Sequence, residues 1–257
     1  METVSQIVEV NGKEYVEHQV PHWRQRYNWD CGVTCVMMML SNEQRKHLLD
    51  NFTHICEEEG FGQFTWTIDL CYLLKRFDIK HHMYTTMMGV NEEYRKHGYY
   101  DQIIDVVTRF DQAPSHQVVV SSGALSPAAL EAHLARGPAI VLVDGGLLAC
   151  DLCKHNKLRA ELRRCFGGSY RGHYIVVVGF LRDARPASPG ARGAPGVRGV
   201  SGVRGVPGAR SVRGARILFR DPARPHPMCA TTAAALHRAR EASGTDHDVI
   251  LVYKDFR

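Results

Sequence analysis

The sequence of 257 residues contains no apolar run of the roughly 18 residues that a membrane-spanning helix needs. Its first residues also lack the basic start and apolar stretch of a secretory signal peptide. We therefore expect no membrane span and a location in the cytoplasm, or also in the nucleus, where thiols stay reduced. The eight cysteines then predict free thiols, a metal site or a catalytic thiol rather than a disulfide framework.

Acidic residues are almost missing from one stretch, residues 182–216, which holds eight arginines and a single aspartate. This stretch contributes +7 to a formal net charge of +5, so the rest of the chain carries −2. The basic charge therefore reflects one segment and says little about the folded body. With 44% apolar and 23% charged residues, the chain has the composition of a globular protein with a sizeable core.

Within the same stretch glycine recurs at every third position from 190 to 214, with Ser211 in the one missed slot, but proline is sparse for a collagen. A collagen triple helix combines this glycine period with abundant proline. The shortage of proline and the strand-like flanks instead predict a disordered Gly/Arg-rich insertion over 182–216, within a single domain that covers 1–257. The arginines of the insertion are expected to attract polyanions.

The order of the apolar patterns predicts an α+β domain. Helical spacing dominates the first half, and short β-branched and aromatic runs dominate the second. Helices are expected over Cys31–Leu40, Thr67–Phe77, Asn91–Phe110, Pro127–Leu134 and Thr231–Ala242, and strands over Ile79–Thr86, Ala139–Val143, His173–Val178, Arg216–Phe219 and Val249–Tyr253. This segregation predicts a helical first half packed on an antiparallel β-sheet second half.

A glutamine six positions before a cysteine marks the strongest candidate site. Cys31 is followed by Gly32 and then by a run that is apolar nearly all round, which predicts that the cysteine opens a buried helix. A helix N-terminus and a nearby imidazolium lower the pKa of a thiol, and the thiolate is the nucleophile. Gly32 is expected to leave room for a substrate, and the Gln25 amide is a candidate oxyanion donor.

The general base is expected at the start of a strand, because a strand end is a rigid place from which an imidazole reaches a helix end. His173 precedes a strong β-branched run, and Asp221 follows the next strand after the insertion. An antiparallel hairpin would return Asp221 beside His173 as the group that orients its ring. The histidines that lie in polar contexts typical of solvated faces are His47, His97, His133 and His237.

The ordered set of these residues resembles the papain-like cysteine-peptidase superfamily, and within it the bacteriocin-processing peptidases. The matching segments are Gln25, Asp30–Gly32, Cys35, Gly172–Phe180 and Asp221–Pro222. The resemblance implies a papain-like fold. It agrees with the reading of the residues as a thiol hydrolase that needs no cofactor, with Cys31 as nucleophile and a peptide, amide or thioester as substrate.

More of the chain resembles a narrower family, the guanylyl cyclase domain-containing family. The matching segments are Tyr27–Gly32, Trp66–Leu74, Gly89–Asn91, Ala139–Asp144, Cys150–Cys153, Gly172–Val176 and Gly244–Tyr253. This resemblance implies conversion of GTP to cyclic GMP with Mg²⁺ or Mn²⁺. The sequence offers no recognisable pair of metal-binding aspartates and no phosphate-binding glycine loop, so the hydrolase is favoured. A non-catalytic regulatory module on the same scaffold is a third hypothesis.

A partial zinc pattern lies between the candidate site residues. Cys150 and Cys153 have the spacing of a zinc-binding pair, and Cys165 follows. His155 or Cys229 is a candidate fourth ligand. The pattern lacks a second close pair, so buried structural cysteines are the alternative interpretation.

Overall fold

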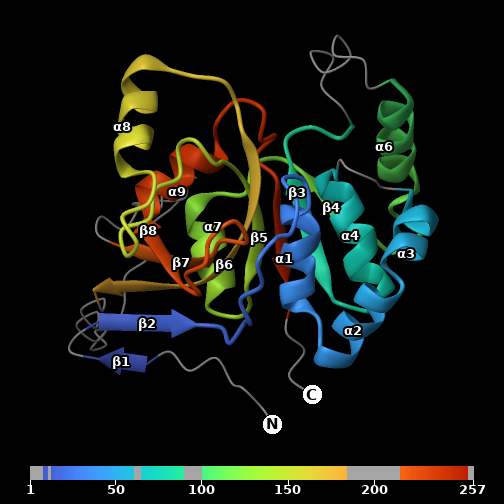
Figure 1. The fold of residues 1–257 in the computed structure, drawn as a ribbon, viewed down its shortest axis with the longest axis horizontal. Coiled ribbons are helices and arrows are strands. Elements are labelled where there is room, and N and C mark those ends of the chain that lie inside the picture. The colour runs from blue at the N-terminus through green and yellow to red at the C-terminus, as the bar shows by residue number, and fades with distance from the viewer. Residues whose placement is uncertain (1–7, 11–12, 61–64, 90–99, 184–214, 254–257) are drawn as a thin grey trace, which may run out of the picture.

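The computed structural model describes residues 8–10, 13–60, 65–89, 100–183 and 215–253 (Figure 1). The glycine repeat lies outside the described residues, as do His97 and the first part of the helix expected over Asn91–Phe110. The prediction of one domain with an inserted segment over 182–216 therefore stays a prediction. Among the described helices, none is long and apolar enough to cross a membrane.

A mixed nine-stranded sheet runs through the described part of the molecule, in the order β1-β2-β6-β5-β9-β3-β4, with β7 and then β8 joined to β6. Its strands are β1 (Val8–Val10), β2 (Lys13–Glu17), β3 (His81–Thr85), β4 (Val120–Ser122), β5 (Ala139–Asp144), β6 (Gly172–Asp183), β7 (Arg216–Arg220), β8 (Cys229–Thr232) and β9 (Val249–Val252). Most pairs are antiparallel, but β3 and β4 are parallel.

Helices cover both faces of this sheet (Figure 1). They are α1 (Cys31–Met39), α2 (Asn42–Asp50), α3 (Phe52–Glu59), α4 (Thr67–Arg76), α6 (Tyr100–Gln112), α7 (Pro127–Leu134), α8 (Lys157–Phe166) and α9 (Ala233–Arg240). The helices α1 to α4 gather on one side of the sheet, and α7 and α9 on the other.

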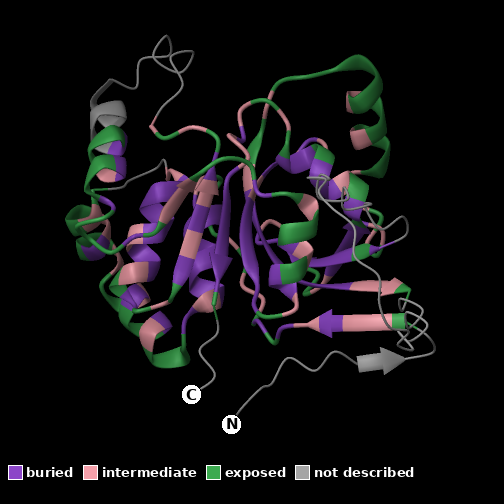
Figure 2. Cartoon of the chain, turned by 180° about the vertical axis from the view of Figure 1, so that it is seen from behind, coloured by how far each residue is buried: buried purple, intermediate pink, exposed green. Residues whose placement is uncertain are grey.

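The central strand β6 explains this layering, because its side chains alternate between two cores. Val176 and Val178 belong to the core cluster that contains α1 and α4. Ile175 and Val177 belong to the second cluster, which contains α7 and α9. All four are fully buried, and burial of each is worth about 1.5–3 kcal/mol. Figure 2 shows the buried sheet between its more exposed helices.

The mixed α and β content is confirmed, but the predicted segregation into a helical half and an antiparallel half is wrong. The first half supplies β1 to β4, and the sheet contains the parallel pair β3–β4. The strand β2 escaped the sequence patterns because it is short and rich in charge, with only Val16 fully buried. The papain-like character of the fold stays a prediction.

The close approach of β2 to β6 depends on Gly179. A Cβ atom at this position would lie 1.8 Å from the carbonyl oxygen of Val16, which is backbone and fixed by strand pairing. At Gly172 in the same strand, the nearest atom to a Cβ is the hydroxyl oxygen of Tyr170 at 2.9 Å, at the free end of a side chain.

We predict that Gly179→Ala lowers the free energy of unfolding by roughly 2–3 kcal/mol, because β2 must shift to relieve the overlap. The matched control is Gly172→Ala, for which the tyrosine can rotate, so the loss should be smaller. Urea unfolding of both variants measures the difference. Equal losses would show that β2 does not pair closely with β6 at this point.

Candidate active site

The loop before α1 is closed by the side chain of Asp30. The backbone N–H groups of Arg26 and Tyr27 each donate to this carboxylate at 3.0 Å. Asp30 is the N-cap residue of α1, but its side chain accepts no hydrogen bond from the helix. The first N–H groups of α1 are therefore left available to another acceptor.

The Cys31 sulfur lies at this position. The backbone groups of Gly32 and Tyr174 and the imidazole of His173 interact with it and favour its ionised form. Burial opposes ionisation of the thiol, but these interactions and the charge of His173 outweigh it and lower the pKa of Cys31. Cys31 therefore ionises more readily than an ordinary buried thiol, although only 7% of the residue is exposed.

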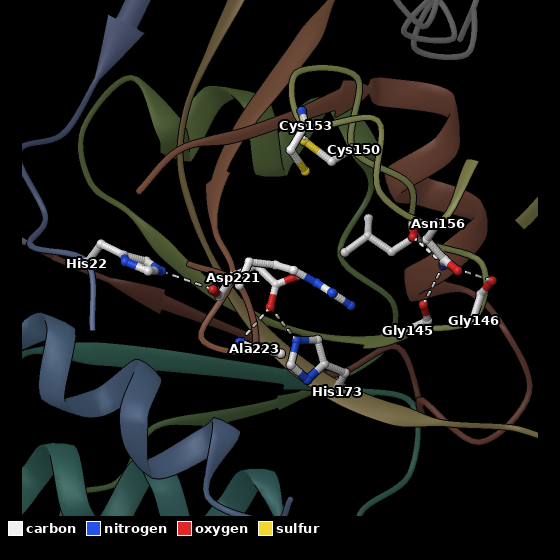
Figure 3. Close-up of polar contacts among 11 residues, drawn as sticks. His22, Gly145, Gly146, Cys150, Cys153, Asn156, His173, Asp221 and Ala223 are labelled. Carbon is white, nitrogen blue, oxygen red and sulfur yellow. Dashed lines mark hydrogen bonds and ion pairs between the residues drawn. The ribbon is translucent and has the colours of Figure 1, made fainter. Parts of the chain in front are cut away.

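His173 and Asp221 are brought together by strand pairing. β6 and β7 are antiparallel, with Val176 opposite Arg220, so the residue after β7 lies near the start of β6. Asp221 Oδ1 accepts hydrogen bonds from His173 Nε2 at 2.8 Å and from the Ala223 backbone N–H at 2.9 Å. Figure 3 shows the ring and the carboxylate directed toward each other.

The charges in this cluster support one another. Burial opposes the charged form of His173, but its bonds to Asp221 and Cys31 raise the pKa of His173 to about 10. Burial likewise opposes ionisation of Asp221, yet the imidazole lowers the pKa of that carboxyl. At neutral pH the imidazolium and the carboxylate are therefore the favoured forms, and the charge of the imidazolium favours the thiolate form of Cys31.

Gln25 lies beside the same turn, but its side chain differs from the expected arrangement. Its backbone N–H donates to the Pro222 carbonyl at 2.9 Å, which fixes the residue next to Asp221. Its side-chain nitrogen donates to the Tyr27 carbonyl at 2.6 Å, and its side-chain oxygen is buried without a partner. One of the two side-chain N–H groups of Gln25, the expected oxyanion donor, therefore already donates to the loop.

Gly32 does not provide the substrate space expected from the sequence. A Cβ atom at this position would meet Leu70 at 3.0 Å and Tyr174 at 3.1 Å. Gly32 instead allows α1 to pack closely against α4 and β6.

A cavity of about 490 Å³ opens beside His173 and Asp221. Three arginines line it, namely Arg159, Arg171 and Arg224. Asp221 is the one acidic residue among the lining residues, and Cys31 is not among them. The cavity therefore offers a cationic surface that favours an anionic ligand.

One wall of the cavity is the loop between β5 and α8. Asn156 holds this loop, because its side-chain nitrogen donates to the carbonyl groups of Gly145, Gly146 and Leu148 at 3.0, 3.3 and 2.7 Å (Figure 3). The loop also carries Cys150 and Cys153.

The predicted metal ligands are only partly together. The sulfurs of Cys150, Cys153 and Cys229 all lie within 4.8 Å of one another. Cys165 lies exposed on α8 and is not part of this group. Cys229, which lies on β8, is therefore the third member of the group in place of Cys165.

A buried polar network next to Cys31 was not expected from the sequence. Thr67 Oγ1 is hydrogen-bonded to the Tyr174 hydroxyl at 2.8 Å and donates to the Asp248 carboxylate. Burial raises the pKa of Asp248 to about 7. Because the Tyr174 backbone also donates to Cys31, this network fixes a residue that contacts the sulfur.

These elements define a mixed α/β domain in which a thiol, an imidazole and a carboxylate meet beside a cationic cavity. The chain belongs to the family described as guanylylate cyclase, whose pattern matches residues 20–252. It is similar to guanylyl cyclase 1 of Arabidopsis thaliana, with 25% identity over 243 residues that cover 91% of this chain and 75% of the relative. No solved structure matches the chain.

We predict that Cys31 reacts with a small alkylating agent at pH 7 and that His173→Ala slows this reaction at least about tenfold. The His173 imidazolium lowers the pKa of the thiol, and each pKa unit regained removes about tenfold of the thiolate. As pH falls through the lowered pKa, the wild-type rate should fall. In His173→Ala that midpoint should lie at higher pH.

Mass spectrometry of the peptide that contains Cys31 measures the rate, with His47→Ala as the control because His47 is exposed and lies on α2. An unchanged rate in His173→Ala would contradict the assigned ion pair.

Proposed function

We propose that this protein is a thiol hydrolase that cleaves a peptide, amide or thioester bond through an acyl-enzyme. The observation that carries the proposal is the hydrogen-bonded series Cys31–His173–Asp221, with a lowered thiol pKa and a raised imidazole pKa. A nucleophile bonded to a base that a third group orients is the arrangement that acyl transfer requires.

In the first half of the reaction, the Cys31 thiolate attacks the carbonyl carbon of the substrate. The tetrahedral intermediate collapses to a thioester on Cys31, and His173 gives its proton to the departing amine or thiolate. Asp221 keeps the ring oriented and stabilises the imidazolium. The second N–H of Gln25 is the proposed oxyanion donor, a contribution worth roughly 3–4 kcal/mol.

In the second half, His173 takes a proton from water while the water oxygen attacks the thioester carbonyl. The C–S bond breaks, a carboxylic acid leaves, and His173 keeps the proton it took from water, so the pair of Cys31 thiolate and His173 imidazolium is restored. No step requires a metal or an organic cofactor.

The cavity narrows the class of substrate. Arg159, Arg171 and Arg224 favour a substrate with negative charge near the bond that is cleaved. We therefore propose an acidic peptide, or another acyl donor that carries carboxylates or phosphates, as the substrate.

A guanylyl cyclase is the second candidate, because the family and the Arabidopsis relative carry that name. The three cavity arginines also suit a triphosphate. The residues do not fit the Mg²⁺ or Mn²⁺ ions that this reaction is expected to use, since Asp221 is the one carboxylate lining the cavity and it already accepts two hydrogen bonds.

A non-catalytic regulatory module is the third candidate. The burial of Cys31 and its absence from the cavity lining favour this candidate. A thiol that no acyl donor reaches would identify such a module.

We predict that an acidic peptide thioester acylates the wild-type protein on Cys31 and is then hydrolysed. Cys31→Ser and His173→Ala should lower turnover at least about 100-fold, because they remove the nucleophile and the base. Gln25→Ala should lower turnover with little change in substrate binding, because it acts on the oxyanion.

Intact-mass measurement during turnover detects the acyl-enzyme, and thiol release measures the rate. His47→Ala and Cys165→Ser are controls at exposed positions. Acylation of Cys165 in place of Cys31, or equal turnover in His173→Ala, would overturn the proposal.

We predict that GTP with Mg²⁺ or Mn²⁺ yields no cyclic GMP above a heat-inactivated control. Mass spectrometry of the nucleotide products measures this outcome. Cyclic GMP formation that survives Cys31→Ser but is lost in Arg159→Ala or Arg224→Ala would establish the cyclase and displace the hydrolase.

A further inference from the structure

The three-cysteine group joins two separate parts of the fold. Cys150 and Cys153 lie in the loop between β5 and α8, and Cys229 opens β8. Their sulfurs converge within 4.8 Å. Cys150 and Cys229 are buried and Cys153 is half-buried, so the group is shielded from most of the solvent.

Backbone groups already hold the first of these sulfurs as an acceptor. The Cys153 backbone N–H donates to Cys150 Sγ at 3.4 Å, and the Ala230 backbone N–H also bonds to this sulfur. The Asp151 backbone N–H donates to the Ala230 carbonyl at 2.7 Å, which ties the loop to β8. Backbone N–H groups directed at a cysteine sulfur support the thiolate that a metal ligand requires.

We propose that Cys150, Cys153 and Cys229 bind a Zn²⁺ ion. In a tetrahedral thiolate site the Zn–S distance is about 2.3 Å, so the sulfurs lie about 3.8 Å apart. The three sulfurs lie within 4.8 Å of one another, at most about 1 Å farther apart than this spacing. The spacing of two residues between Cys150 and Cys153 is also common in zinc sites.

Two of the three cysteines line the cavity, so the fourth ligand of the ion would come from the cavity side. Cys150 and Cys229 line the cavity that also contains His155 and Asp221. His155 is not among the groups within 4.8 Å of the three sulfurs, so a water molecule from the cavity would complete the tetrahedron. Three thiolates on Zn²⁺ leave a charge of −1, which the arginines of the same cavity offset.

The ion would cross-link two segments that form the wall of the cavity. It would link the β5–α8 loop to β8, and β8 pairs with β7, the strand that ends next to Asp221. Loss of the ion should therefore loosen the wall of the cavity while leaving Cys31 and its helix in place. The zinc site does not depend on the protein being a hydrolase.

The metal content of the purified full chain tests the proposal, together with the thiolate-to-metal absorption of the Co²⁺-exchanged protein. We expect about one zinc per chain, removable by a chelator with a fall in Tm that added Zn²⁺ reverses. Cys153→Ser, at the half-buried position, should weaken Co²⁺ binding at least about 100-fold while circular dichroism stays unchanged.

Cys229→Ser should do the same, whereas Cys165→Ser and Cys31→Ser should bind the metal normally. Retention of the metal in Cys153→Ser or Cys229→Ser would overturn the proposal. A purified chain that binds neither Zn²⁺ nor Co²⁺ would also overturn it. So would a disulfide bond between two of these cysteines that forms in a reducing cell and is detected by mass spectrometry.

Discussion

The antiparallel pairing of β6 with β7 holds the site together. His173 and Asp221 are 48 residues apart in the sequence, and the segment between them includes the glycine repeat. Strand pairing makes this separation unimportant, because the register Val176–Arg220 fixes where β7 ends relative to the start of β6. The entropy of closing a longer loop grows only logarithmically, so the insertion costs the site little.

Electrostatics then determine what the positioned groups do. A buried thiol alone would stay protonated, and a buried imidazole alone would stay neutral. Together with Asp221 they reverse both tendencies, since each charge compensates the burial of the next. The removal of any one partner leaves an uncompensated buried charge, which is why the three residues behave as a unit.

The sequence could predict elements whose signal is local. The run after Cys31 is apolar nearly all round and forms α1, and Thr232 caps α9 close to the expected start. The helix α2 was missed because its composition is polar, although a capping box at Ser41 and Gln44 marks its beginning. His133 and His237 were expected on solvated faces but are buried, and His133 bonds to the Pro138 carbonyl at 3.0 Å.

Predictions that depend on distant parts of the chain were less complete. Cys229, a candidate fourth ligand in the sequence, joins Cys150 and Cys153 through the pairing of β8 with β7, whereas Cys165, which is nearer in the sequence, does not join them. The contacts of the Gln25 amide and the close packing of Gly32 likewise depend on neighbours that the local motif does not contain. By contrast, the order of Cys31, His173 and Asp221 in the sequence is sufficient to predict that they lie together. Antiparallel pairing of the strands that carry His173 and Asp221 is the simplest way to bring these two residues side by side.

The family name and the cluster point to different reactions, and the ionisation of Cys31 separates them most directly. The ultraviolet absorbance of the thiolate, titrated with pH in the wild-type protein and in Cys31→Ser, reports this ionisation alone. We predict that the difference between the two proteins appears well below about pH 8.5 and that His173→Ala moves it to higher pH. A difference that emerges only near about pH 8.5, the value for an ordinary thiol, would contradict it.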